Sequence, residues 1–386
     1  MTGALENIRV LDLSRVLAGP YCTMILGDLG AEVIKVESPD RNDETRKWGP
    51  PFQNGVSAYY LSANRNKKGI TVDLNCEEGV AVIKKLVGES DVIINNFKTG
   101  TMKKFGLDYD TLKEINPRLV YCSITGFGET GPDRNMPGYD FIIQAMSGLM
   151  SITGNKKSGP LKSGVAITDI LTGLYACIGI QSALLERVQS GQGQKLDIAL
   201  YDCAVSALVN TGSDYLMSEA IPTPLGNEHA NIVPYQTFQT LDGEIVIAVG
   251  NDDQFKSLCR VMGQLHYAVD ERFKTNPMRV ENRKELIPIL QKKFLTKPSI
   301  YWHKKCRDNN IPCGPIQNLE QVVNDPQLAS RNMFIEHDHP TAGMIKMVGS
   351  PLKLSRTPVQ VKYHPPDRGE HNEEIIGRLV SSKIND

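Results

Sequence analysis

Short apolar segments alternate with helical segments along the first third of the chain, and this alternation constrains the fold more than any other feature. The apolar runs that predict strands cover residues 8–13, 31–36, 69–74, 91–94 and 119–124. Helices are predicted between them, over residues 20–29, 75–88, 99–105 and 109–115. Because a helical crossover joins parallel strands, the pattern predicts an α/β fold with a Rossmann-like, doubly wound, mainly parallel sheet.

The pattern changes after residue 222. Helices are predicted over residues 139–150, 169–189 and 201–218, with a strand over 195–199. Proline, glycine and polar residues then lead into a hairpin, whose turn is indicated by Asp242-Gly243 between two apolar runs. We therefore predict a large Rossmann-like domain formed by residues 1–222 and 330–386, and a small α+β domain over residues 223–329.

The charge balance excludes broad polyanion binding. The 386 residues include 43 Lys and Arg against 44 Asp and Glu, a net charge of −1, so we expect no nucleic-acid partner. Residues 163–185 contain Asp169 as their one charged residue, but glycine, threonine and glutamine interrupt the apolar run. We interpret this segment as a helix buried in protein, and we expect no association with a membrane.

The eight cysteines are scattered, with no C-x-x-C pair or other zinc-binding spacing. This distribution predicts no metal site and suits a reducing compartment. The first residues lack a basic segment followed by an apolar one. We therefore expect a cytoplasmic protein.

Asp169 is the residue that chemistry alone singles out. It lies at the predicted start of an apolar helix, where the backbone N–H groups favour an ionised carboxylate. One interpretation is an ordinary N-terminal helix cap. The other is a carboxylate nucleophile in a dry cleft. Residue spacing does not decide between the two.

The turn after the first strand is a second candidate, because such turns often meet phosphate groups through helix N-terminal amides. Residues 14–20 do not form the G-x-G-x-x-G fingerprint, which disfavours a nicotinamide-dependent oxidoreductase. Lys98 and Lys104 flank a segment that follows a predicted strand. Such lysines are usually solvated surface residues, but this is also where a phosphate-bearing ligand would be met.

Seven motifs occur together in the chain: residues 15–20, 29–37, 95–97, 123–128, 138–140, 144–148 and 165–169. Each is weak alone, but the combination, from about Ile8 to Pro351, resembles the family III CoA-transferases. The resemblance matches Asp169 to the catalytic aspartate of that family. It implies an interlocked homodimer, with acyl-CoA and small carboxylic acids as substrates and no tightly bound cofactor.

The resemblance also implies a mechanism. The Asp169 carboxylate would attack the donor thioester and form an aspartyl–acyl anhydride, which CoA thiolate converts to an aspartyl-CoA thioester. The acceptor carboxylate would then repeat these steps in reverse. Each step exchanges one activated acyl group for another, provided that water is kept out. Backbone amides near the cleft would stabilise the oxyanions.

The positions that bind CoA follow from the same resemblance. They are Val16 and Leu17 near the thioester, Val72, Asp73, Leu74, Asn75, Asn96 and Phe97 around the adenine, and Lys98 and Lys104 at phosphates. The formyl-CoA transferases of the family have glutamine in place of Leu17, arginine in place of Lys104, and a tetraglycine loop. This chain has Gly250-Asn-Asp-Asp-Gln-Phe255 in the small domain instead.

Within the family, residues 64–68, 232–236 and 250–251 are most similar to the members that transfer CoA from succinyl-CoA to dicarboxylates. Acetyl-CoA or formyl-CoA with oxalate is the alternative substrate pair. Acyl-CoA racemases share the fold but use a histidine where this chain has Tyr139, whose hydroxyl is a poor base near neutrality. A transferase is therefore favoured over a racemase, and Tyr139 is a second candidate catalytic residue. A non-catalytic acyl-CoA binder, with Asp169 as a helix cap, is the remaining alternative.

Overall fold

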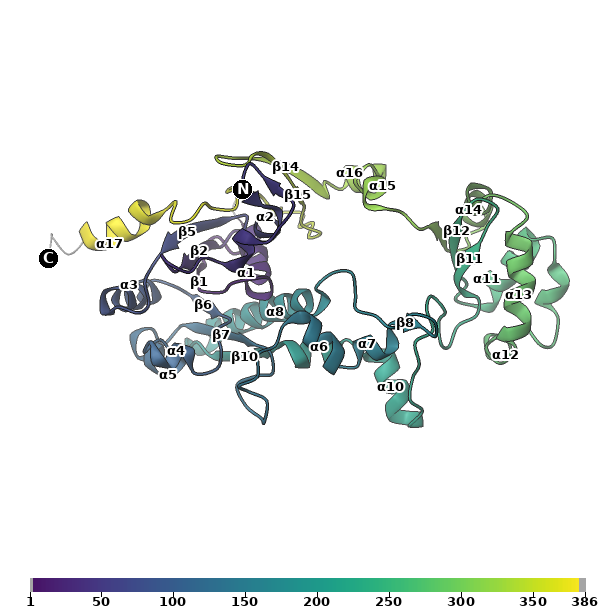
Figure 1. The fold of residues 1–386 in the computed structure, drawn as a ribbon, viewed down its shortest axis with the longest axis horizontal. Coiled ribbons are helices and arrows are strands. Elements are labelled where there is room, and N and C mark those ends of the chain that lie inside the picture. Colours follow the sequence, from purple (N-terminus) through teal and green to yellow (C-terminus); the bar gives the residue numbers. More distant parts are fainter. Residues whose placement is uncertain (1–2, 382–386) are drawn as a thin grey trace. The chain divides into compact units, whose positions relative to one another are not determined.

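The chain forms two compact units in the computed structural model, which describes residues 3–381 (Figure 1). The first unit contains residues up to 150 together with 162–220 and those from 327 onward. The second contains residues 151–161 and 221–326. The sequence analysis placed residues 151–161 in the large domain. In the structure they form the short hairpin of β8 (Gly154–Asn155) and β9 (Gly159–Pro160) in the second unit.

A six-stranded parallel sheet forms the centre of the first unit, in the order β10-β7-β6-β1-β2-β5. The strands are β1 (Arg9–Asp12), β2 (Glu32–Glu37), β5 (Lys67–Thr71), β6 (Val92–Asn95), β7 (Val120–Thr125) and β10 (Lys195–Ala199). This arrangement confirms the predicted α/β fold class. From β1 the chain adds β2 and β5 on one side and then returns to form β6 on the other side of β1, so the strand order reverses between β1 and β6.

Helices cover both faces of this sheet. On one face, α1 (Ala18–Asp28) and α8 (Ile167–Ser190) pack on Val10, Val92 and Ile124. On the other, α3 (Glu77–Gly88) and α5 (Tyr109–Ile115) cover Leu11, Ile93 and Ile70. The central strands are buried on both sides, which explains why they read as continuous apolar runs.

The remaining elements of the first unit are short. They are η1 (Glu44–Lys47), β3 (Phe52–Gln53), β4 (Val56–Ser57), α2 (Ala58–Ser62), α4 (Thr101–Lys104), α6 (Asp140–Met146), α7 (Leu149–Ile152, which extends into the second unit), α9 (Leu200–Ser206), α10 (Val209–Ser218), β14 (Phe334–His339), β15 (Gly343–Val348), η3 (Glu373–Gly377) and α17 (Arg378–Ser381). The predicted helix over 201–218 is thus two helices.

The second unit contains a small antiparallel sheet. Its order is β11-β12-β13, formed by Tyr235–Gln239, Glu244–Ala248 and Cys313–Pro315. The predicted hairpin at Asp242-Gly243 is confirmed by the pairing of β11 with β12. Phe238, Phe294 and Trp302 lie in its core. The helices are α11 (Asp252–Val261), η2 (Leu265–Ala268), α12 (Asn276–Glu281), α13 (Arg283–Phe294), α14 (Ser299–Arg307), α15 (Leu319–Val323) and α16 (Pro326–Ser330, at the unit boundary).

By length and composition, α8 is one helix that could cross a membrane. Its inner face packs on α1 and the sheet through Thr172, Ala176 and Ile180. Its outer face is exposed in this single chain, since Ile178 and Val188 keep 59% and 79% of their accessible surface. The predicted burial of this helix therefore applies to one face only.

Two glycines of α8 provide a test of its close packing on α1. A Cβ atom at Gly173 would lie 2.7 Å from the backbone carbonyl oxygen of Ala18, whereas the close contact of one at Gly179 would be with the flexible end of the Leu196 side chain (2.6 Å). We expect Gly173→Ala to lower the free energy of unfolding by about 1–3 kcal/mol, because backbone must move. Gly179→Ala, the matched control, should be near neutral because alanine favours helix. Thermal and urea unfolding measure both, and equal effects would contradict the packing argument.

Candidate active site

The loops that follow β1 and β6 meet where the strand order reverses. The Arg15 backbone N–H donates to the Asn96 side-chain oxygen (2.9 Å), and the Asn96 amide donates back to the Arg15 carbonyl (2.6 Å). A cavity of about 190 Å³ opens at this point. Its wall consists mainly of residues 15–18, 96–99 and 134–139, together with Asp169. This is the position at which doubly wound sheets bind their ligands.

Asp169 is not a helix cap. Helix α8 begins at Ile167 after the N-cap residue Ala166, so Asp169 is the third helical residue. The Thr168 N–H donates instead to the Asp140 carboxylate (2.8 Å), and the Thr168 hydroxyl donates to the same oxygen (2.6 Å). Among residues 3–381, no donor forms a hydrogen bond with the Asp169 carboxylate. The capping interpretation is therefore wrong, and the carboxylate faces the cavity without a bonded partner.

The surroundings of Asp169 disfavour its charge. Burial raises the pKa of the Asp169 carboxyl to about 7, and the nearby Asp140 carboxylate contributes to the rise. The N-terminal dipole of α8 acts in the opposite direction. A carboxylate that is ionised near neutral pH but poorly solvated is more reactive toward a carbonyl carbon than one in bulk water.

Two tyrosines lie near this carboxylate. Tyr139 immediately precedes α6, remains 65% exposed and lines the same cavity as Asp169. Tyr59 of α2 was not among the predicted residues. Burial raises the pKa of Tyr59 to about 12, and the negative charges of Asp169 and Asp140 add to the effect. Nothing in the sequence connects Tyr59 with Asp169, because 110 residues separate them and only the fold relates α2 to α8.

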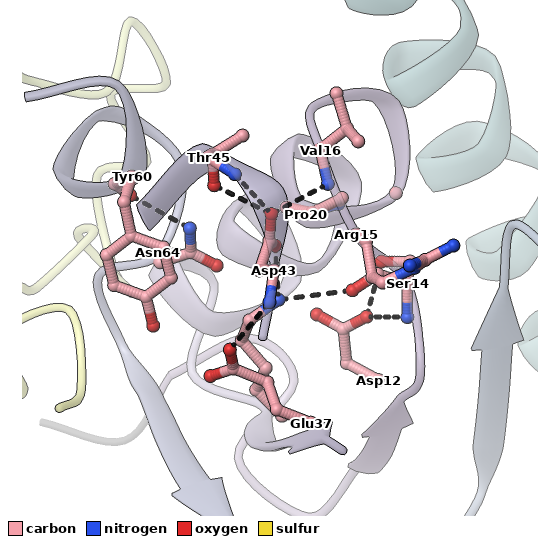
Figure 2. A network of polar contacts seen from close by, with 12 residues as sticks. Asp12, Ser14, Arg15, Val16, Pro20, Glu37, Asp43, Thr45, Tyr60 and Asn64 are labelled. Atoms are coloured by element: carbon pink, nitrogen blue, oxygen red, sulfur yellow. Dashed lines mark hydrogen bonds and ion pairs between the residues drawn. The ribbon is translucent and has the colours of Figure 1, made fainter. Parts of the chain in front are cut away.

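Buried polar side chains hold loop 14–17, the segment from Ser14 to Leu17 (Figure 2). Val16 has a left-handed backbone with φ of 69°, which costs a β-branched residue about 1–3 kcal/mol. Its N–H donates to Asp43 (3.2 Å). Although burial acts in the opposite direction, the Lys35 ammonium and Thr45 lower the pKa of Asp43 to about 2. A hydrogen bond to such a charged acceptor contributes about 1.5–3 kcal/mol, enough to offset the strain.

Comparison with known proteins places this arrangement in a family. The model of the family described as CoA-transferase family III matches residues 5–372. The chain belongs to CoA-transferase family III. The enzymes of this family use CoA thioesters as substrates, so this chain is a CoA-transferase.

Two curated relatives match this CoA-transferase over nearly its full length. The succinate–glutarate CoA-transferase of Agrobacterium fabrum is 43% identical, over 97% of this chain and 95% of the relative. The human succinyl-CoA:glutarate CoA-transferase is 42% identical, over 97% and 86%. Among solved structures, a CaiB/BaiF family protein from Brucella suis has a TM-score of 0.86 at 44% identity, covering 98% of this chain and all of that one.

The positions predicted to contact CoA lie at two further hollows of this CoA-transferase as well as at the first cavity. A hollow of about 480 Å³ is lined by Val72, Leu74, Asn75 and Phe97, and also by Arg41, which the sequence analysis did not identify. Arg15 and Phe97 line both this hollow and the Asp169 cavity. The third hollow, of about 540 Å³, adjoins Leu74 and Asn75 and is lined by Lys104.

The remaining positions predicted to bind CoA lie at the Asp169 cavity, with the exception of Asp73. Val16, Leu17, Asn96 and Lys98 line the Asp169 cavity. Asp73 lines none of these hollows, and its carboxylate accepts the N–H (2.9 Å) and side-chain amide (2.8 Å) of Asn75. The side chain of Asn96 is occupied by the Arg15 backbone, so its hydrogen bonds hold the loop.

A substitution of Asp140 tests whether its negative charge raises the pKa of Asp169. As a nucleophile, Asp169 would have to be ionised, so activity should fall as the pH decreases through about 7. Asp140→Asn keeps an oxygen for Thr168 but removes the neighbouring charge, so the pKa of Asp169 should fall. We expect the acid limb of the pH profile of kcat/KM to move to lower pH.

The matched control for this test is Asp202→Asn. Asp202 is an exposed acid in the first turn of α9 and is not among the charges that raise the pKa of Asp169. Its profile should coincide with that of the wild type. An acid limb that stays in place in Asp140→Asn would contradict the proposed charge effect.

Proposed function

We propose that this chain transfers CoA from succinyl-CoA to a dicarboxylate acceptor such as glutarate, with Asp169 as the nucleophile. The observation that carries the proposal is the unbonded Asp169 carboxylate in a cavity at the reversal of the sheet, with its pKa raised to about 7. The names of the two curated relatives support the choice of substrates.

In the first half of the reaction, an Asp169 oxygen attacks the thioester carbonyl carbon of succinyl-CoA. The C–S bond breaks and leaves an aspartyl–succinyl anhydride and CoA thiolate. The thiolate then attacks the Asp169 carbonyl carbon, and succinate leaves as a carboxylate. The result is an aspartyl-CoA thioester, formed without net consumption of a proton or of water.

In the second half, a carboxylate oxygen of the acceptor attacks the aspartyl-CoA carbonyl carbon and releases CoA thiolate. The thiolate attacks the acceptor's carbonyl carbon in the new anhydride. The product acyl-CoA forms, and Asp169 leaves as a carboxylate, ready for the next cycle. The partial burial of Asp169 limits the access of water, which would otherwise hydrolyse both activated intermediates.

Backbone groups at the start of α1 support the oxyanion steps. Leu17 and Ala18 line the Asp169 cavity, and the first N–H groups of a helix have no acceptor within that helix. Donors of this kind stabilise the negative charge that develops on a carbonyl oxygen. Arg134 lines the same cavity and supplies positive charge for the second carboxylate of a dicarboxylate.

The test is a panel of acyl-CoA donors against mono- and dicarboxylate acceptors. We expect transfer from succinyl-CoA to glutarate, and we expect butyrate, which lacks the second carboxylate, to be a poorer acceptor. Hydroxylamine should trap the activated carboxyl group, and peptide mass spectrometry should locate it at Asp169. Exchange of the α-hydrogen without transfer would instead indicate a racemase.

The variant that tests the nucleophile is Asp169→Asn. It should lose more than about a thousandfold in kcat, because the amide cannot form the anhydride. It should remain folded and melt at a higher temperature than the wild type above pH 7, since a group with a raised pKa destabilises the fold once it ionises. Binding of acyl-CoA with wild-type activity in this variant would contradict the mechanism.

We also propose that the enzyme is an interlocked homodimer, as the family resemblance implies. Large apolar side chains cover the outer faces of α8 and α10, among them Leu185, Val188, Val209, Leu216 and Met217, which are 70–88% exposed in a single chain. Monomeric proteins rarely leave such a surface in water. A second copy of the chain would cover it.

Light scattering tests this assembly. The wild type should have the mass of two chains at every dilution, because interlocked chains do not separate without unfolding. Val188→Glu places a charge on the apolar face and should reduce the yield of dimer. Ile300→Glu, at a similarly exposed position (70%) of α14, is the control. A monomeric wild type would contradict the proposal.

A further inference from the structure

We infer that Asp43 is a positioning residue for the transfer reaction, and that it acts by holding loop 14–17 in the conformation that forms one wall of the Asp169 cavity. The inference rests on the proposed function. It concerns a residue that borders the second hollow but does not line the Asp169 cavity, and whose side chain has no exposed surface. Its effect must therefore pass through the groups to which it is bonded.

Both oxygens of the Asp43 carboxylate have partners within the protein. Oδ1 accepts the N–H of Val16 (3.2 Å) and both the N–H (3.1 Å) and hydroxyl (2.7 Å) of Thr45. Oδ2 accepts the ammonium of Lys35 (2.9 Å). Through Lys35, Asp43 thus joins the loop that follows β1 to the centre of strand β2. Figure 2 shows its contacts with Val16 and Thr45.

Lys35 and Asn96 hold the same loop at its other peptide groups. The Lys35 ammonium, also fully buried, donates to the Ser14 carbonyl (3.1 Å) as well as to Asp43. Asn96 engages both the N–H and the carbonyl of Arg15. Three successive residues of loop 14–17 are therefore each fixed by a polar side chain from β2 or from the segments that follow β2 and β6.

Of these three residues, Val16 depends most on its hydrogen bond, because its backbone conformation is strained. Its left-handed backbone is one that a β-branched side chain rarely adopts. Leu17 and Ala18, which line the cavity, follow it directly in the chain. A rotation at Val16 would therefore move the amides proposed to stabilise the oxyanions. Displacements of about 1 Å at such groups reduce rates by about a hundredfold.

The Asp43→Asn substitution tests whether Asp43 stabilises loop 14–17, and it changes the side-chain volume very little. Asparagine offers one acceptor oxygen and one NH₂ donor, so it can satisfy Lys35 or Val16, but not both. We expect kcat to fall by at least about tenfold, with less than about a threefold change in KM for acyl-CoA. The control is Asp28→Asn, which disrupts a comparably buried ion pair with Arg65 in the same unit. It should lower the melting temperature and leave kcat unchanged.

The Val16→Gly background separates positioning from general stability. Glycine adopts a left-handed backbone without strain, so Asp43→Asn should reduce kcat by a smaller factor in that background than in the wild type. Equal losses in the two backgrounds would overturn the inference. Equal losses of kcat in Asp43→Asn and Asp28→Asn would also overturn it.

Hydrogen exchange provides a readout that does not depend on transfer. Peptides covering residues 14–18 should exchange faster in Asp43→Asn than in the wild type or in Asp28→Asn. Unchanged exchange would overturn the inference. If the wild type transferred CoA in no donor–acceptor pair, the proposed function would fail, while the exchange comparison would still test the hold of Asp43 on the loop.

Discussion

The buried ion pair between Lys35 and Asp43 is the interaction on which the rest of the site depends. Neither side chain has exposed surface, and together they bind the Ser14 carbonyl and the Val16 amide of the loop above β1. Lys67 and Asp12 form a second buried pair beside it, and Asp12 binds Ser14 as well. Burying these charges is costly unless each is paired. Their arrangement fixes one backbone conformation at the edge of the sheet where the cavity opens.

The site contains two carboxyl groups, Asp43 and Asp169, whose environments shift their pKa values in opposite directions. Asp43 is paired with a buried ammonium, and its pKa is lowered to about 2, so it stays ionised and bonded. Asp169 has no bonded partner among the described residues, and burial with the charge of Asp140 raises its pKa to about 7. The first arrangement gives rigidity, and the second is the one that we propose for the nucleophile. Placing two acids in such different environments is a general way for a protein to assign them different roles.

Much of the first unit could be predicted from sequence, because each parallel strand is buried on both sides and reads as a short apolar run. The central strands and α1, α3 and α8 lie within a few residues of their predicted positions. Asp169 was recognised as one charge in an apolar helix. Its role as cap or nucleophile could not be decided, because that depends on where α8 begins and on Asp140, which lies 29 residues earlier in the chain.

The sequence by itself determined the fold class, the candidate nucleophile and, through its motifs, the family, because periodicity and motif spacing are local properties of the chain. Only the tertiary structure decided that Tyr59 lies within electrostatic reach of Asp169 and that Asp43 holds Val16. Only it decided that the side chain of Asn96 binds the Arg15 backbone. These relations join residues far apart in sequence, and a hydrogen bond or a shift in pKa depends on distances and burial that exist only after the sheet has formed.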